Sequence, residues 1–565
     1  ITPIFTAVEV FLEILIPFIT ASIIDKGIQA GDMRKVGIYG GIMLVIAFLS
    51  LFCGIQAGKY AAAASTGFAC NLREKMYENI QTFSFSNIDK FSTAGLVTRL
   101  TTDVTNLQNA YQMILRMCMR APASMIIAMI MSFYINARLA SIYLVAVILL
   151  GTCLFLIMRS ATKYFEQAFP KYDELNASVQ ENVSAIRVVK AYVREDYETG
   201  KFHKASENIY KIFCKAEENL SFNAPLMQLT VYSCILLISW LGAKMIVGSS
   251  LSTGELMSLL TYCMNILMSL MMLSMVFVMI TMSLASARRI SEVLNEKSDL
   301  DNPENPDFSI PDGSITFDHV YFNYKKGAGE PVLSDINLSI QSGETIGIIG
   351  GTGSAKTSLV NLISRLYDVT DGSVKVGGKD VRSYDMETLR NEVAVVLQKN
   401  VLFSGTILDN LRWGDKNASE EECKRVCRLA CADEFIDRMP EGYNTYIEQG
   451  GSNVSGGQKQ RLCIARALLK KPKVLILDDS TSAVDTATDA KIRKAFLTEI
   501  PETTKLIIAQ RISSVQDADR IIVMENGKVN GFGSHEELLK TNEIYREVYE
   551  SQTGGDGDFD EKRGE

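Results

Sequence analysis

Apolar residues are concentrated in six long stretches in the first half of the chain, and each stretch carries little or no charge. They cover residues 1–24, 36–58, 112–137, 139–160, 220–243 and 256–287. Because about 20 helical residues cross a bilayer core, each stretch is long enough to span a membrane. The pattern predicts an α-helical six-span transmembrane domain over residues 1–296.

Two of the connections between these stretches are long and rich in Lys and Arg, and the others are short. Basic loops stay on the cytosolic side of a membrane, so the long connections and everything after the sixth span are predicted to be cytosolic. The long connections contain few helix breakers. We therefore expect them to extend the spans as helices that turn round near residues 92–103 and 191–199.

The chain changes character after the sixth span. Residues 297–313 are polar, contain Pro303, Pro306 and Pro311, and are predicted to form a linker. Alternating apolar strands are expected at residues 314–322 and 333–340, followed by an apolar strand at 345–349. The pattern predicts an α/β domain over residues 314–550 and a disordered acidic tail over 551–565.

Composition excludes some functions. The net charge of −8 over 565 residues argues against a nucleic-acid partner, which usually requires a basic face. The 11 Cys residues form no CxxC motif. Cys423, Cys427 and Cys431 recur every four residues, which favours packing on one helical face over a metal site. Reduced thiols are typical of a cytosolic domain.

A glycine-rich loop follows the strand at residues 345–349 and precedes a predicted helix. Its residues are Gly350, Gly351, Thr352, Gly353, Ser354, Ala355, Lys356, Thr357 and Ser358. A strand, such a loop and a helix in this order form a phosphate-binding loop, in which backbone N–H groups hold the phosphates. We expect Lys356 to contact the terminal phosphates of a nucleotide and Thr357 to coordinate Mg²⁺. The loop alone would also fit a GTPase or a kinase. Ala355 replaces a glycine, and we expect nucleotide binding to survive.

Several further motifs follow in a characteristic order, and with them residues 314–548 resemble the ATPases of ABC transporters. They are Tyr324, Gln398, Ser455, Gly456, Gly457, Gln458, Asp478 and Asp485. The resemblance implies that Tyr324 stacks on adenine, and that Gln398 and Asp478 join Thr357 around Mg²⁺. It also implies that the Val454–Gln458 signature contacts ATP held by a second chain, and that Ser482–Asp485 crosses between the chains.

The whole chain resembles the ABC exporters that combine six spans with one such ATPase. That family implies a partner: two half-transporters joined head to tail, with membrane lipid around them. By the same resemblance, the two cytosolic turns are coupling helices, and the second contacts the partner chain's ATPase. The resemblance also implies a bacterial cytoplasmic membrane and an amphipathic small-molecule substrate.

Two catalytic positions depart from the family pattern. Asp479 stands where the family has Glu, and Gln510 stands where it has His. The shorter carboxylate and the uncharged amide are expected to slow hydrolysis at this chain's own site. The combination resembles the degenerate-site subunit of heterodimeric multidrug-type exporters, whose signature serves the partner's site. The alternatives are a homodimeric lipid or peptide exporter and a regulatory ATP-sensing membrane subunit.

A few polar residues lie within the apolar stretches. Glu9 and Glu13 are one helical turn apart, as are Arg116 and Arg120. Buried membrane carboxylates are usually paired or face a cavity. They predict either a Glu–Arg cluster that joins the first span to the third, or a carboxylate pair that attracts cationic substrates. In the Met-rich sixth span, Asn265 and Met268 are further candidate substrate contacts.

Overall fold

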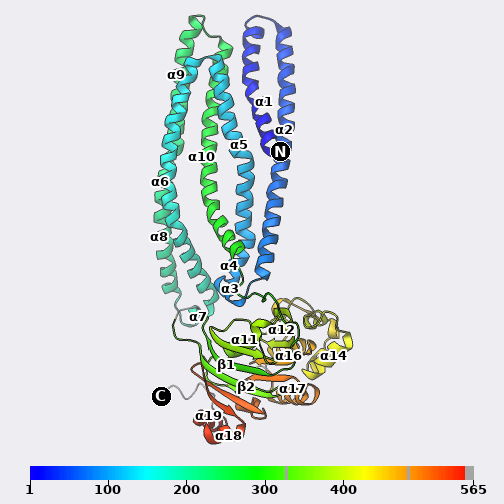
Figure 1. The fold of residues 1–565 in the computed structure, drawn as a ribbon. Coiled ribbons are helices and arrows are strands. Elements are labelled where there is room, and N and C mark those ends of the chain that lie inside the picture. Colours follow the sequence, from blue (N-terminus) through cyan, green and yellow to red (C-terminus); the bar gives the residue numbers. More distant parts are fainter. Residues whose placement is uncertain (325–328, 480–483, 554–565) are drawn as a thin grey trace. The chain divides into compact units, whose positions relative to one another are not determined.

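The structure, a computed structural model, describes residues 1–324, 329–479 and 484–553. The predicted acidic tail from residue 554 onward and the Ser482–Ala483 part of the predicted crossing loop lie outside these ranges. The chain divides into two compact units (Figure 1). The first contains Ile1–Gln81 and Phe91–Glu296, and the second contains Thr82–Lys90 and the chain from Lys297 onward.

The described residues of the first unit form helices and short connections, without strands. Its α-helices are α1 (Thr2–Ile23), α2 (Met33–Gln81), α4 (Thr93–Thr98), α5 (Val104–Ile135), α6 (Ala137–Ser184), α7 (Ile186–Ala191), α8 (Glu195–Ser221), α9 (Asn223–Val247) and α10 (Thr253–Asn295), with π-helical turns at Ile24–Ile28 and Arg99–Asp103. Among the described residues, six helical segments are long and apolar enough to cross a membrane. The predicted six-span helical class is confirmed.

Polar contacts fix α1 against α10 within the apolar bundle. The Tyr262 hydroxyl donates to the Ile14 carbonyl at 2.8 Å, and the Ser258 hydroxyl donates to the Pro17 carbonyl at 2.7 Å. At the end of α1, Asp25 accepts the Gly254 backbone N–H at 2.8 Å. A Cβ at residue 254 would lie 2.5 Å from the Ala21 carbonyl oxygen, so this close approach requires glycine.

The first cytosolic turn lies earlier in the chain than predicted. Helix α2 ends at Gln81, the short helix α3 covers Phe85–Lys90, and residues 93–103 are already helical on the return path. The prediction of a turn near 92–103 is therefore wrong. Ser84 and Asn87 cap the start of α3, because Asn87 Oδ1 accepts the Ser84 backbone N–H at 3.1 Å and Ser84 Oγ accepts the Asn87 backbone N–H at 3.4 Å. The second reversal, at residues 192–194, lies within the predicted range.

The second unit is built on three sheets. The described strands form a six-stranded sheet in the order β12-β11-β3-β10-β9-β6, a four-stranded antiparallel sheet β2-β1-β4-β5, and the pair β7-β8. The strands are β1 (Ile315–Phe322), β2 (Leu333–Ile340), β3 (Thr345–Ile349), β4 (Asp371–Val376), β5 (Lys379–Asp380), β6 (Val393–Val396), β7 (Gly405–Thr406), β8 (Tyr446–Ile447), β9 (Val474–Asp478), β10 (Thr504–Ile508), β11 (Arg520–Glu525) and β12 (Lys528–Gly533).

Strand β9 is buried along its whole length, because both faces of the larger sheet are covered. Val474 and Ile476 belong to one core cluster, while Leu475 and Leu477 belong to another. The second cluster also contains Cys423, Cys427 and Cys431, which agrees with their predicted packing role.

Helices cover the sheets and form a separate helical part. They are α11 (Lys356–Ile363), α12 (Met386–Glu392), α13 (Ile407–Leu411), α14 (Glu420–Leu429), α15 (Asp433–Ile436), α16 (Gly456–Leu469), α17 (Thr486–Glu499), α18 (His535–Thr541) and α19 (Glu543–Thr553), with 3₁₀ turns at Val381–Ser383, Gly442–Asn444, Gln449–Gly451 and Ile512–Ser514.

Candidate functional site

Four parallel strands of the six-stranded sheet end at the same edge. Strand β3 pairs in parallel with β10, β10 with β9, and β9 with β6. The carboxyl ends of adjacent parallel strands meet in space, and ligands of α/β sheets bind there. The glycine-rich loop follows β3, Gln510 follows β10, Asp478 ends β9, and Gln398 follows β6. The fold therefore brings these candidate residues to one edge.

The glycine-rich loop wraps around the side chain of Lys356. The Lys356 ammonium donates to the carbonyl oxygens of Gly350 and Gly351, at 2.7 and 2.9 Å. A Cβ at residue 350 would lie 2.3 Å from the Met524 carbonyl oxygen, so the loop passes too close to β11 for another residue type. The loop brings the positive charge of Lys356 close to the N-terminal end of α11, and this combination can bind a phosphate group.

Ala355, the residue that replaces a glycine, lies at the N-cap of α11 in the left-handed region, with φ of 72° and ψ of 24°. Its methyl group packs against the apolar core of the unit. Left-handed backbone costs an L-residue about 1 kcal/mol that glycine avoids. The loop therefore keeps the conformation of a glycine-containing loop at some cost in stability.

We expect Ala355→Gly to raise the stability of the protein by about 1 kcal/mol, because it removes this strain. The measurement is the thermal unfolding temperature of the purified full chain. Ala490→Gly is the matched control, since Ala490 is exposed within α17 and has ordinary helical geometry. That control should lower stability by about 1 kcal/mol. Equal shifts from both variants would contradict the strain at Ala355.

Thr357 and Asp478 form the candidate metal position. The Thr357 hydroxyl donates to both carboxylate oxygens of Asp478, at 3.1 and 3.0 Å. Burial of Asp478 raises the pKa of its carboxyl group, although the Thr357 hydrogen bond opposes the shift. A hydroxyl and a carboxylate at this spacing are hard oxygen donors of the kind that Mg²⁺ binds beside phosphates. Gln398 is exposed and lies just after β6, the strand next to the β9 strand that ends in Asp478.

The two departures from the family pattern contact each other. The Gln510 side-chain amide donates to Asp479 Oδ2 at 3.3 Å. Asp479 has φ of 48°, a left-handed conformation that Asp tolerates better than most residues. Both side chains line a cavity of about 130 Å³ at the carboxyl edge of the sheet. The carboxylate is therefore held by an amide next to the candidate metal position.

Tyr324 connects the loop region to a cluster of aromatic side chains. Its hydroxyl lies 2.8 Å from the Ser358 hydroxyl, and its ring packs edge-on against Tyr367 with centroids 5.1 Å apart. Tyr367 in turn donates a hydrogen bond to Asp89 at 2.8 Å and contacts the ring of Phe85. Asp89 and Phe85 lie in α3, so Tyr367 connects the predicted adenine-stacking residue to the side chains of that helix.

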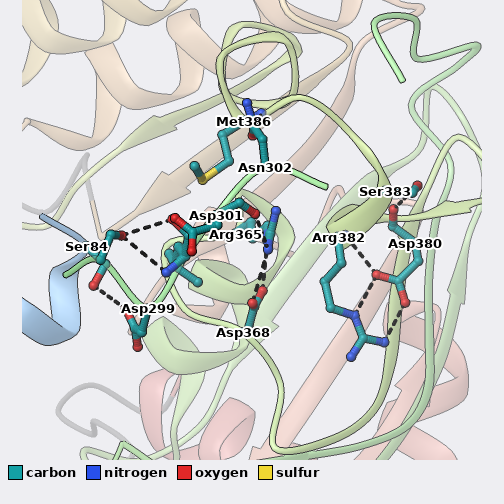
Figure 2. A network of polar contacts seen from close by, with 12 residues as sticks. Ser84, Asp299, Asp301, Asn302, Arg365, Asp368, Asp380, Arg382, Ser383 and Met386 are labelled. Carbon is teal, nitrogen blue, oxygen red and sulfur yellow. Dashed lines mark hydrogen bonds and ion pairs between the residues drawn. The ribbon is translucent and has the colours of Figure 1, made fainter. Parts of the chain in front are cut away.

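Polar contacts from the N-terminal part of α3 join it to residues that follow Glu296 (Figure 2). The Ser84 hydroxyl donates to Asp299. The Asn87 amide donates to the Lys297 carbonyl at 3.1 Å. Nearby, Arg365 donates to Asp368 at 2.9 Å and to the Asp301 carbonyl at 3.2 Å. Sequence reasoning missed this attachment. The aromatic residues Phe85 and Tyr367 were the available signal, but their pairing requires the fold.

The signature lies at the N-terminal end of α16. Ser455 caps the helix and accepts the Gln458 backbone N–H, while Gln458 Oε1 accepts the Ser455 backbone N–H at 2.9 Å. Ser455 and Gly456 are exposed, and Gly457 is half-buried. Asp485 caps α17, and the Thr488 backbone N–H that it accepts lowers the pKa of its carboxyl group. The signature thus presents a helix N-terminus to solvent, where an anion can bind.

Comparison with known proteins agrees with this geometry. A family model described as the ABC transporter transmembrane region matches residues 1–271, and one described as ABC transporter matches residues 333–482. An uncharacterized ABC transporter ATP-binding protein, YfiB of Bacillus subtilis (strain 168), is 38% identical over 552 residues, which is 97% of this chain and 95% of that protein. The chain belongs to the ABC transporter family.

Two further comparisons add to this assignment. An ATP-dependent lipid A-core flippase of Desulfotalea psychrophila (strain LSv54 / DSM 12343) is 34% identical over 483 residues, 85% of this chain and 84% of that protein. The solved structure of a bacterial Atm1-family ABC exporter with ATP bound matches the fold with a TM-score of 0.85, 23% identity and 98% coverage of both chains. This ABC transporter has the fold of an exporter half-transporter, and it is a multi-pass membrane protein with a cytosolic transport ATPase domain.

The structure also places the candidate substrate residues of the ABC transporter. Arg120 donates to Glu9 at 2.7 Å and to Glu13 at 2.7 Å, so the first and third spans are joined by ion pairs. The predicted Glu–Arg cluster exists, with Arg120 as its centre. Asn265 is half-buried in α10 and Met268 is 53% exposed. Neither lines the cavity that contains Glu9 and Glu13.

Proposed function

We propose that this half-transporter is the subunit with the impaired ATP site in a heterodimeric exporter of amphipathic small molecules. The hydrogen bond between Asp479 and Gln510 carries the proposal. A Glu at residue 479 would reach one methylene further, and a displacement of about 1 Å costs on the order of 10²-fold in rate. Asp479 also accepts an amide proton here, which competes with its use as an acceptor for an attacking water.

The residues that bind nucleotide are kept, in contrast to those that activate water. Lys356 and the loop N–H groups suit the phosphates, and Tyr324 offers an exposed ring for adenine. Thr357 and Asp478, with Gln398 nearby, would hold Mg²⁺, which neutralises phosphate charge when bound. Binding without fast hydrolysis is what these residues support, so this chain's own site would hold ATP for long periods.

The exposed signature supports the second half of the proposal. Ser455, Gly456, Gly457 and Gln458 match the family motif, and the helix N-terminus behind them attracts anions. We propose that they complete the hydrolysing site of a different chain, one with the usual Glu and His. Asp485 would lie at that junction. ATP binding then closes the paired ATPase domains, and hydrolysis in the partner's site resets them.

A second candidate function is lipid export. It is favoured by the 34% identity to a protein named as a lipid A-core flippase. A lipid and a drug-like amphiphile share an apolar body and a polar head, so the two candidates differ in substrate and not in the cycle of ATP binding and hydrolysis.

We expect ATP hydrolysis in lipid to be slow for this chain alone and fast for its complex with a half-transporter encoded beside it. Asp479→Asn in this chain should change the rate of the complex by less than about 2-fold, because the partner's site carries the turnover. The measurement is phosphate release from reconstituted protein. Fast hydrolysis by the single chain that is lost in Asp479→Asn would establish a homodimer instead.

A further inference from the structure

The membrane unit contains a cavity with unusual charge for its location. It has a volume of about 500 Å³ and lies between α1 and α2, with Arg116 of α5 at its edge. Its polar lining includes Glu9, Glu13 and Arg116, and its apolar lining includes Leu51 and Ile55. Ionisable side chains inside a membrane segment are costly and mark functional sites by default.

The ion pairs of the cluster do not satisfy all of its polar atoms. Arg120 shares its guanidinium between Glu9 Oε1 and the Glu13 carboxylate. Glu9 is only 6% exposed, and no hydrogen-bond donor among the described residues reaches its second oxygen, Oε2. A buried carboxylate oxygen without a donor costs free energy unless a ligand or solvent supplies one. Glu9 lines the cavity, and this oxygen has no donor among the described residues.

Arg116 supplies the complementary feature. Its Nε is buried and has no acceptor within the described part of the chain. Arg116 lies one helical turn from Arg120 on α5 and lines the same cavity as Glu9. Two carboxylates and two guanidinium groups leave the cluster with no net charge. A cation beside Glu9 is therefore also repelled by the two guanidinium groups, and an anion beside Arg116 is also repelled by the two carboxylates.

Glycine makes room for the buried carboxylate. A Cβ at residue 54 would lie 2.9 Å from Glu9 Oε1 and 3.6 Å from Oε2. Gly54 therefore leaves the space that the Glu9 side chain occupies beside α2. One turn to the cytosolic side, Phe5 of α1 stacks on Tyr60 of α2 with ring centroids 6.0 Å apart. The polar part of the cavity thus lies against α2 at Gly54.

We propose that this cavity binds the head of a zwitterionic amphiphile. An ammonium group would donate to Glu9 Oε2, and an acidic group on the same molecule would accept from Arg116, while the apolar chain lies on Leu51 and Ile55. A molecule with one charge satisfies only one of the two unpaired atoms. The inference rests on the proposed export function and assigns a ligand class to this site. Such a head can belong to a membrane phospholipid or to a free amphiphile.

The test is binding of tail-labelled lysophosphatidylethanolamine to the full chain in nanodiscs, measured by fluorescence anisotropy above empty nanodiscs. The comparison probes are lysophosphatidylglycerol, which is anionic, and a primary alkylammonium, which is cationic. We expect the zwitterion to bind about 10-fold more tightly than either, because it pairs both polar atoms. Equal binding of the cationic and zwitterionic probes would overturn the inference.

Two variants locate the binding. Gly54→Leu fills the space beside Glu9 and Glu9→Gln removes its charge, and each should weaken zwitterion binding about 10-fold. Gly41→Leu is the matched control, because Gly41 lies on the same helix, is exposed and has no atom near its missing Cβ. The control should bind normally. Unchanged binding in Gly54→Leu would place the ligand elsewhere and reject the site.

The composition of the nanodisc distinguishes the two sources of ligand. If a membrane phospholipid occupies the cavity, discs of phosphatidylethanolamine should weaken probe binding relative to discs of phosphatidylglycerol. If the ligand is a free amphiphile, the two discs should give the same affinity. Binding is measured without nucleotide, so its absence rejects the site and leaves the proposed ATP-driven export intact. If binding is normal but transport is absent, the proposed ATP-driven export is rejected and the binding site is kept.

Discussion

Replacing Ser455 by Arg in this chain should reduce ATP hydrolysis by its heterodimeric complex at least about 100-fold. Loss of a single preorganised donor to a reacting group costs about 10²–10³-fold. Arg also removes the serine cap of α16 and adds a positive charge at a helix end that already carries positive potential. Its side chain would fill the space in front of the helix N-terminus, where we place the partner's ATP. The measurement is phosphate release by the reconstituted complex.

Ser419→Arg is the matched control for this variant. Ser419 caps α14 with the same capping box, since its side chain accepts the Glu422 backbone N–H and Glu422 reaches back to Ser419. Both variants lose a helix cap, which costs about 1 kcal/mol of stability. We expect the control to unfold at a similarly lowered temperature and yet hydrolyse ATP normally. If both variants lose activity equally, the loss reflects folding and the signature has no special role.

Replacing Arg289 by Met should cost about 3 kcal/mol of stability. Asp103 is 1% exposed and is held by Arg289 through two hydrogen bonds, at 2.8 and 2.5 Å, and by the Ser286 hydroxyl at 2.8 Å. The Arg289 side chain is 42% exposed, but its removal leaves the buried Asp103 carboxylate without a counter-charge. Met preserves the volume and removes only the charge and donors. The measurement is the thermal or denaturant unfolding midpoint of the full chain in detergent.

The neighbouring residue provides the control. Arg288 is exposed, and its replacement by Met should change stability by less than about 0.5 kcal/mol. The double variant Asp103→Asn with Arg289→Met removes both charges and should be more stable than Arg289→Met alone. If the double variant is the less stable of the two, the buried charge is not the source of the loss.

The sequence was most informative where chemistry depends on local spacing. The loop from Gly350 to Thr357 and the six spans could be read from patterns within single elements. The contact between Asp479 and Gln510 could not be predicted in this way. It depends on β9 and β10 being neighbours in the sheet, although α17 lies between them in the chain. In the sequence, Asp479 and Gln510 are two separate departures from the family pattern, and only the strand order brings them into contact.

Helix register limited the predictions in the membrane unit. Glu9, Glu13, Arg116 and Arg120 could be expected to meet because each pair lies on one helical face. Which arginine would bond both carboxylates depends on how α1 and α5 are rotated, and the answer is Arg120. Asn265 and Met268 lie apart from that cavity for the same reason. The position of α3 was also unpredictable, since Tyr367 lies far along the chain from Asp89.

The attachment of residues 82–90 to the second unit has a consequence for protein engineering. A hybrid that joins this membrane segment to a foreign ATPase at residue 297 would keep Phe85 and Asp89 but lose the tyrosine ring and hydroxyl that they contact. Exchanging the short segment together with the ATPase would preserve that fit. The second unit is therefore discontinuous in the sequence, and a hybrid with a single junction at residue 297 separates residues 82–90 from the rest of that unit.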